Sequence, residues 1–313
     1  MKEQKTVRRI LFITATRIGD AVISTAILND LLTRYPEARF TIACGPVAEG
    51  VFSAMPRLER LILMPKMKRD GHWFKLWAQV VRRRWDLVID LRGSGTAFFL
   101  RARQRRILKG GRRPGSRLGQ LAESMGLAPA PLPVAWTSLE DRARAAALLP
   151  AGVPLIGLGP TANWSGKVWP PERFVDLYRR LAAEALPGAR AVVFAGPGAG
   201  EAALAEPVLA ALPDAIDLAG RLTLPEAAAC LARLDLFIGN DSGLMHLAAA
   251  AGTPTLGLFG PSPVDEYAPS GRRAGVAVAP GPHGRAPMDG LTVEAALVAA
   301  RDLLNAEKRQ TAA

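Results

Sequence analysis

A carboxylate stands near the start of the chain, where a short apolar run gives way to a helical pattern. Asp20 follows residues 10–15 and the polar turn 16–19, and apolar residues at helical spacing come after it. Aspartate at the start of a helix commonly accepts hydrogen bonds from the first backbone amides, so capping is the first interpretation. The spacing alone favours this capping role for Asp20, and the turn lacks the GxGxxG spacing of a nicotinamide site.

Two loops of the second half combine glycine with charge. Lys167 lies in a loop that follows residues 155–158 and leads into a helical pattern, and Glu201 follows a Gly-rich turn of similar kind. A cation beside the free amides of a helix N-terminus suits a phosphate or pyrophosphate, although an exposed loop lysine needs no ligand. Glu201 can accept from ribose hydroxyls, or can merely favour the positive end of its helix.

A third polar turn has the most distinctive composition. Asp241, Ser242 and Gly243 separate an apolar run from an apolar helical pattern. The first amides of that helix would form an anion site, and Asp241 is placed for a hydroxyl group or a cap. His246 falls on the apolar side and is expected to be a hydrogen-bonded core residue. The chain has no DxD, HExxH or paired Cys and His pattern, so no metal is expected and Lys167 would supply charge for a diphosphate.

These turns need strands and helices to position them, and the composition provides for two packed domains. The chain has 313 residues, of which 49% are apolar and 22% charged; this is enough for two cores. Aliphatic runs alternate twice with longer helical patterns, which predicts a parallel sheet covered on both faces in each half. A Pro-containing passage predicts domains 1–150 and 151–313. Strands are expected at residues 10–15, 39–44, 61–64, 87–91, 155–158, 191–194, 236–238 and 255–259, and helices at 21–34, 73–84, 139–149, 172–185, 201–212, 225–233, 244–251 and 293–304.

One region carries the excess positive charge. The net charge is +12, and residues 66–117 hold sixteen Lys or Arg against three acidic residues. Such a surface favours an anionic partner, which can be a phosphorylated lipid, an acidic sugar or a nucleic acid. Solvation of exposed loops is the simpler alternative. Because no stretch approaches the ~18 apolar residues of a membrane span, we expect a cytoplasmic protein that is soluble or peripherally attached.

Four motifs occur in an order that is specific as a set: Arg17-Ile-Gly-Asp20, Lys167-Val-Trp-Pro170, Gly239-Asn-Asp-Ser-Gly-Leu-Met-His-Leu247 and Leu258-Phe-Gly-Pro-Ser-Pro263. With them the chain resembles glycosyltransferase family 9, the ADP-heptose:lipopolysaccharide heptosyltransferases, over nearly its whole length. The resemblance implies an α/β fold of the GT-B class, with two Rossmann-like doubly wound domains facing a central cleft. It also implies an acceptor-binding N-terminal domain and a nucleotide-sugar-binding C-terminal domain closed by the last helix.

The activity implied by the resemblance is an inverting transfer of a heptose or related sugar from an ADP-sugar to a lipopolysaccharide core acceptor, without a metal or other cofactor. Asp20 matches the family's catalytic base, and Lys167 matches its phosphate-binding lysine. The amides around Ser242, Gly243 and Leu244 match the diphosphate cradle. The other residues expected at the donor are Thr161, Asn163, Glu201, Leu222 and Asp241.

The acceptor implied by the resemblance is an anionic lipid-linked glycan, and the basic region 66–117 would then bind this acceptor. We expect peripheral attachment to the inner face of the cytoplasmic membrane, with Trp73, Phe74 and Trp77 at the interface. The residues expected at the acceptor are Arg17, Gly19, Lys66, Lys68, Arg69, Arg92, Arg112 and Arg113. No nucleic-acid partner is expected, because no helix-turn-helix or interleaved aromatic and basic strand is found. A nucleotide-sugar epimerase of the same architecture and a transferase using another nucleotide sugar are the alternatives.

Overall fold

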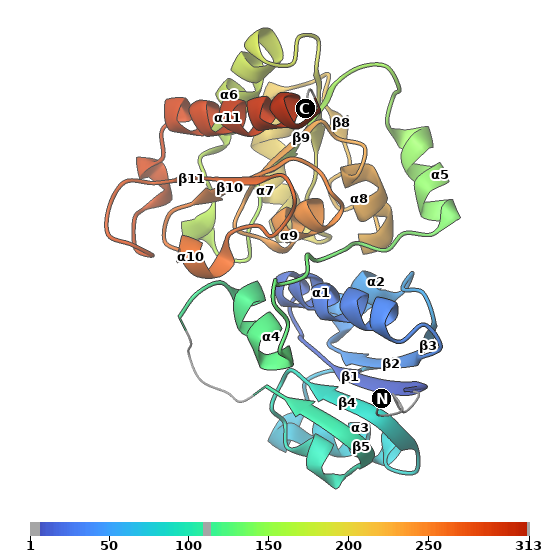
Figure 1. Cartoon of the computed structure of the whole chain (residues 1–313). Coiled ribbons are helices and arrows are strands. Elements are labelled where there is room, and N and C mark those ends of the chain that lie inside the picture. Colours follow the sequence, from blue (N-terminus) through green and yellow to red (C-terminus); the bar gives the residue numbers. More distant parts are fainter. Residues whose placement is uncertain (1–6, 109–113, 312–313) are drawn as a thin grey trace. The chain divides into compact units, whose positions relative to one another are not determined.

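The chain forms two compact units, Met1–Trp136 and Thr137–Ala313. The computed structural model describes residues 7–108 and 114–311. Each unit is built on a sheet whose strand pairs are all parallel, with helices between the strands (Figure 1). The expected α/β class with two parallel sheets is confirmed.

The first unit holds a five-stranded sheet in the order β3-β2-β1-β4-β5. Successive connections run outward in opposite directions from β1, so the sheet has a topological switch point between β1 and β4. Open α/β sheets bind ligands outside the carboxyl ends of the strands at such a point. The elements are β1 (Arg9–Ile13), α1 (Ile18–Arg34), β2 (Arg39–Cys44), η1 (Pro46–Ala48), α2 (Glu49–Phe52), β3 (Leu58–Leu63), η2 (Lys68–Asp70), α3 (Gly71–Val80), β4 (Arg84–Asp90), η3 (Thr96–Phe99), β5 (Arg101–Ile107) and α4 (Arg117–Met125).

One strand of this unit was not predicted. β5 has the sequence RARQRRI and pairs with β4 from Arg84↔Arg101 to Asp90↔Ile107. Its charged side chains suit the edge of a sheet, where they discourage pairing with another chain. Arg103 on β5 forms an ion pair with Asp86 on β4, with an N···O distance of 3.2 Å. Strands were predicted from apolar runs, and this basic segment contains no such run.

The second unit holds a six-stranded sheet in the order β11-β10-β9-β6-β7-β8. Its switch point lies between β6 and β9, as in a dinucleotide-binding sheet. Two edge strands, β8 and β11, were not predicted. The elements are α5 (Leu139–Leu148), β6 (Leu155–Gly159), η4 (Ser165–Lys167), α6 (Pro171–Glu184), β7 (Arg190–Val193), α7 (Ala199–Ala211), β8 (Ile216–Asp217), α8 (Leu224–Leu231), β9 (Leu236–Asn240), α9 (Gly243–Ala250), β10 (Thr255–Phe259), α10 (Val264–Tyr267), β11 (Ala274–Val278), η5 (Met288–Gly290) and α11 (Val293–Thr311).

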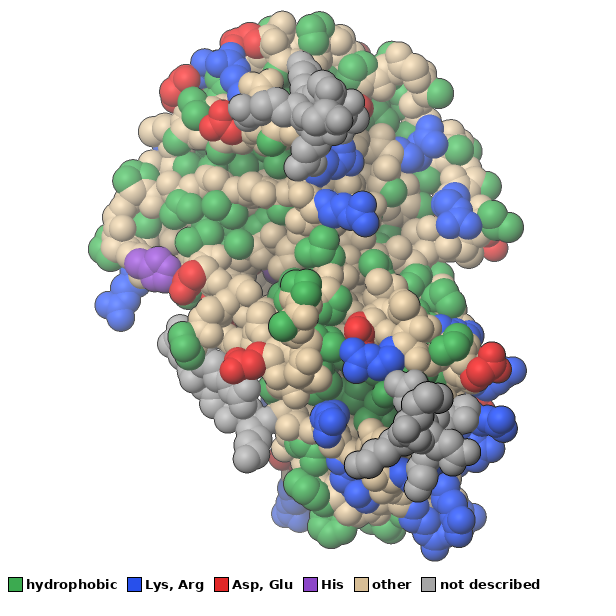
Figure 2. Space-filling view, viewed as in Figure 1, with side chains coloured by type: hydrophobic (Ala, Val, Ile, Leu, Met, Phe, Trp, Pro, Cys, Tyr) green, Lys and Arg blue, Asp and Glu red, His purple; other side chains and the backbone are tan. Residues whose placement is uncertain are grey.

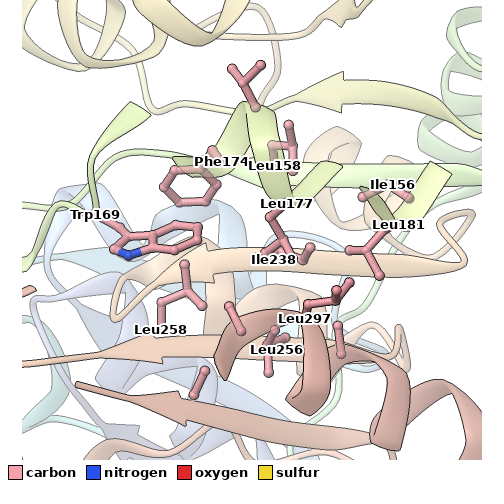
Figure 3. Close-up of a cluster of buried hydrophobic side chains, with 14 of the residues drawn as sticks. Ile156, Leu158, Trp169, Phe174, Leu177, Leu181, Ile238, Leu256, Leu258 and Leu297 are labelled. Atoms are coloured by element: carbon pink, nitrogen blue, oxygen red, sulfur yellow. The ribbon is translucent and has the colours of Figure 1, made fainter. Parts of the chain in front are cut away.

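A large core lies against one face of this sheet, beneath α6 and α11. Figure 3 shows apolar side chains of the strands, such as Ile238 and Leu258, among those of the two helices. Trp169 is fully buried in this core, and its indole N–H donates to the Leu291 carbonyl at 2.9 Å. The loop before α6, which carries Lys167, therefore ends on a rigid support.

The two units divide earlier in the chain than the expected boundary at residue 150. Helix α5 precedes that boundary, yet it packs against α8 of the second unit. Ser138 starts α5 with a capping box, in which its hydroxyl accepts from the Asp141 amide at 3.0 Å. The linker is therefore the extended passage before Ser138, and the Pro-containing passage near residue 150 is a loop inside the second unit.

Candidate functional site

Lys167 and Asp241 lie together at the switch point of the second sheet. Lys167 belongs to the loop after β6, and Asp241 directly follows β9, the neighbouring strand. The Lys167 ammonium donates to Asp241 Oδ2 at 2.5 Å, and the carboxylate is buried. Lys167 Nζ also lies 6.0 Å from the ring centroid of Tyr267. Two polar loops distant in sequence thus meet in one charged pair.

The loop that carries Lys167 is fastened to β9 by a fully buried amide. Asn240 Oδ1 accepts from the Trp169 backbone N–H at 3.1 Å, and Asn240 Nδ2 donates to the Thr161 carbonyl at 3.5 Å. Thr161, an expected donor contact, is itself buried. Both ends of the loop are therefore bound to the neighbouring strand, which fixes the position of Lys167.

Replacing Asn240 with Ala is expected to lower the free energy of unfolding by about 1–3 kcal/mol, because the Trp169 amide would lose its acceptor inside the core. Denaturant unfolding measures this change. Asn163→Ala is the matched control, since Asn163 lies exposed in the same loop and makes no hydrogen bond to another described residue. Equal stability of the two variants would show that Asn240 does not hold the loop.

The N-terminus of α9 provides hydrogen-bond donors beside the lysine. Ser242 occupies the N-cap position but does not cap with its side chain, and its buried Oγ has no partner among the described residues. The amides of Gly243 and Leu244 come before the first hydrogen bond within the helix, so they are available to a ligand. A cation and a helix N-terminus side by side form a site for an anion.

Other expected donor residues follow strands of the same sheet along the chain. Glu201 is in the first turn of α7, and its Oε2 accepts from the Gly196 N–H at 3.0 Å, so it fastens the Gly-rich turn after β7. Leu222 is half-buried in the loop between β8 and α8. Ser262 follows β10 and received no role from the sequence. Its buried hydroxyl has no partner among the described residues, a property that only packing reveals.

Asp20 does not cap its helix, so the capping interpretation is wrong. Helix α1 begins at Ile18 with Arg17 at the N-cap, and no side chain caps it. The Asp20 carboxylate lies in the first turn instead, with Oδ1 3.5 Å from Arg117 Nε, and each side chain is about one-third exposed. Arg117 is the first residue of α4, which Ser116 caps by accepting from the Gly119 amide at 3.1 Å. The sequence gave no sign of this partner.

The expected acceptor residues of the first unit follow the carboxyl ends of its strands. Parallel strands bring these ends to one edge of the sheet, and β1, β3 and β4 lead into the loops concerned. The described residues at this edge are Arg17, Gly19, Lys66, Lys68, Arg69 and Arg92, all exposed except the half-buried Gly19. Arg112 and Arg113 lie outside the described residues.

Neither cysteine is suited to nucleophilic chemistry. Burial, with a smaller contribution from Glu49, raises the pKa of Cys44 to about 12. Burial, with a smaller contribution from Glu226, raises the pKa of Cys230 to about 11. Both are free thiols and remain protonated at neutral pH, whereas the thiolate is the reactive form.

The described residues form neither a metal site nor a membrane span. No group of three or more His, Cys, Asp or Glu side chains in residues 7–108 and 114–311 is placed to hold a metal ion. In the same ranges no helix combines the length and the apolar character needed to cross a bilayer.

Known proteins are similar to this chain in sequence and architecture. The lipopolysaccharide heptosyltransferase 2 of Salmonella typhimurium is 28% identical over 86% of this chain and 87% of its own. A glycosyl transferase family 9 structure from Veillonella parvula has a TM-score of 0.80 at 22% identity, covering 96% of this chain and 98% of its own. The ADP-heptose lipopolysaccharide heptosyltransferase II of E. coli has a TM-score of 0.76 at 23% identity, covering 96% and 99%.

The expected resemblance is confirmed at the level of the family. The family model for glycosyltransferase family 9 (heptosyltransferase) matches residues 116–286. This range begins at the Ser116 cap of the helix that carries Arg117, and it includes Lys167, Asp241 and the N-terminus of α9. The Lys167–Asp241 pair and the N-terminus of α9 thus lie within the matched region, and the chain belongs to glycosyltransferase family 9.

Proposed function

We propose that the enzyme transfers a heptose from an ADP-sugar to a lipopolysaccharide core acceptor, with inversion and without a metal. The observation that carries the proposal is the Lys167 ammonium, bonded to Asp241 next to the N-terminus of α9. A departing diphosphate is an anion that this cation and these amides can stabilise as its charge develops. Because the chain belongs to a glycosyltransferase family, transfer of a sugar is favoured over the epimerase alternative.

Within this proposal the second unit binds the donor. The diphosphate oxygens accept from Lys167 Nζ and from the amides of Gly243 and Leu244, and Ser242 Oγ donates to one of them. The diphosphate then shares Lys167 with Asp241. Glu201 and Leu222 contact the ribose and the adenine, and Thr161 and Asn163 flank the phosphates. The names of the Salmonella typhimurium and E. coli relatives support heptose as the sugar and ADP as the carrier.

The first unit supplies the base and binds the acceptor. The acceptor oxygen attacks the anomeric carbon while its proton passes to the Asp20 carboxylate, and the bond from that carbon to the ADP oxygen breaks. Attack from the side opposite the leaving group inverts the configuration. Arg117, 3.5 Å from Asp20 Oδ1, orients the carboxylate.

The exposed cations at the carboxyl edge of the first sheet would bind the anionic groups of the acceptor. Lys66, Lys68, Arg69 and Arg92, together with Arg17, present charges that suit phosphate or sugar-acid groups. Because such an acceptor is anchored in lipid, the enzyme would work at the inner face of the cytoplasmic membrane. This localisation agrees with the excess of positive charge in residues 66–117.

Thermal unfolding with different nucleotides tests the donor site. ADP at about 100 times its Kd is expected to add about 2.7 kcal/mol to the stability of the second unit, a rise of several degrees in Tm. The rise should be the same in EDTA, because Lys167 and helix amides replace a metal. UDP and GDP at the same concentration serve as controls for the base. An ADP effect that requires a divalent ion would contradict the metal-free proposal.

A further inference from the structure

An exposed aromatic surface covers the face of the first unit that α3 and η3 share. Phe74 of α3 is 69% exposed, and Phe98 and Phe99 of η3 are 67% and 74% exposed. The Phe74 ring stacks on Trp77 with centroids 5.5 Å apart, and the Trp77 indole N–H donates to the Phe99 carbonyl at 3.4 Å. The two segments are therefore in contact, and their phenylalanines form one surface, named here the aromatic face.

None of these three phenylalanines belongs to the core of the first unit. The inner sides of both segments supply the core of the first unit, through Leu76 and Val80 of α3 and through Ala97 and Leu100 at η3. Trp73 and Trp77 pack against the same core and are half-buried. The interface is thus expected at Phe74, Phe98 and Phe99 rather than at the two tryptophans. Exposed rings gathered outside the core mark a surface that meets a partner.

Cations flank the aromatic face at both ends. Lys75 directly follows Phe74 in the sequence, and Arg101 lies two residues after Phe99. Arg101 is the first residue of β5 and is in register with Arg84, the first residue of β4. All three side chains are exposed, and none forms an ion pair with another described residue. Figure 2 shows Lys and Arg side chains clustered over the first unit. Aromatic rings surrounded by unpaired cations match a bilayer whose headgroups are anionic.

We propose that the aromatic face docks on an anionic lipid bilayer, with Phe74, Phe98 and Phe99 inserted at the level of the headgroups and Lys75, Arg84 and Arg101 on the lipid phosphates. This proposal adds a membrane-binding surface to the proposed function. It rests on the proposed function only for the reason why the protein would dock on a membrane. Helix α3 begins directly after η2, which carries Lys68 and Arg69. Docking would therefore bring Lys68 and Arg69, two of the expected acceptor-binding cations, near the bilayer surface, where a lipid-linked acceptor is found.

Co-sedimentation with vesicles tests the docking. Wild-type protein should bind vesicles of phosphatidylcholine with phosphatidylglycerol, should bind pure phosphatidylcholine weakly, and should be released by salt. The Phe98→Gln/Phe99→Gln double variant is expected to lower the partition coefficient by about tenfold to a hundredfold, because two rings lose their insertion. Lys75→Gln/Arg101→Gln should weaken binding to the anionic vesicles alone.

The controls are Leu139→Gln and Arg144→Gln on α5, where Leu139 is 80% exposed and Arg144 is exposed. Both should bind vesicles like the wild type, and all variants should keep the wild-type Tm because the exchanged side chains lie outside the core. Equal binding of the Phe98/Phe99 variant and the wild type would overturn the proposal. So would equal binding to neutral vesicles, or no vesicle binding at all, the result expected of a face that meets a protein.

The proposed function is tested apart from the docking by ADP-induced stabilisation and by transfer to a water-soluble glycan fragment. Variants of the aromatic face should leave both unchanged, since Phe98 and Phe99 have no part in either. Failure of transfer with intact vesicle binding would contradict the proposed function and leave the docking standing.

Discussion

Replacing Asp20 with Ala is expected to lower kcat by about 10²–10⁴-fold, the usual contribution of a general base, and to leave ADP affinity nearly unchanged. The carboxylate belongs to the first unit and has Arg117 as its ion-pair partner. Lys167 and the amides of α9, to which the proposal assigns the diphosphate, belong to the second unit. Initial transfer rates with saturating donor measure the loss, and titration with ADP measures the affinity.

Asp30 provides the control for the Asp20 variant. It lies on the same helix and forms an ion pair with Arg34 at 2.8 Å on an exposed surface. Asp30→Ala removes one carboxylate from α1 without touching the proposed site, so kcat should stay at the wild-type value. Loss of ADP binding in the Asp20 variant, or equal kcat in both variants, would show that Asp20 is not the base.

The sequence predicted the central strands that carry the site better than it predicted the edge strands of the two sheets. Strands β1, β6, β9 and β10 are central and buried, so each appears as an aliphatic run that a pattern can find. β5 is basic, β8 has two residues, and β11 is an edge strand rich in small residues. Their pairing depends on the neighbouring strand and not on their own composition.

Lys167 and Asp241 could each be predicted from its own polar turn, whereas the contacts that join distant segments could not. Lys167 and Asp241 meet because their loops follow β6 and β9, which are neighbouring parallel strands of the sheet. The Asp20 and Arg117 pair joins α1 to α4 across almost a hundred residues, and no local pattern signals such a contact. For the same reason the sequence suggested a helix cap for Asp20 where the fold provides an arginine.

Replacing Lys167 with Ala is expected to weaken ADP binding by about 10- to 100-fold, the effect of removing one charge-assisted hydrogen bond of about 1.5–3 kcal/mol. Transfer should fall at least as much, because the same cation stabilises the leaving diphosphate. The variant also leaves the buried Asp241 carboxylate without its partner, which lowers stability for a reason unrelated to the ligand. Calorimetric titration and denaturant unfolding must therefore be measured on the same variants.

Asp241→Asn and the Lys167→Ala/Asp241→Asn double variant separate these two effects. Asn at position 241 keeps the shape of the side chain but no longer competes with a diphosphate for Lys167, so ADP affinity should hold or rise. In the double variant no unpaired buried charge remains, so stability should return toward the wild-type value while ADP affinity stays as low as in Lys167→Ala. If restoring stability also restored ADP affinity, Lys167 would act by holding the loop, and the diphosphate would be bound by the amides of α9 alone.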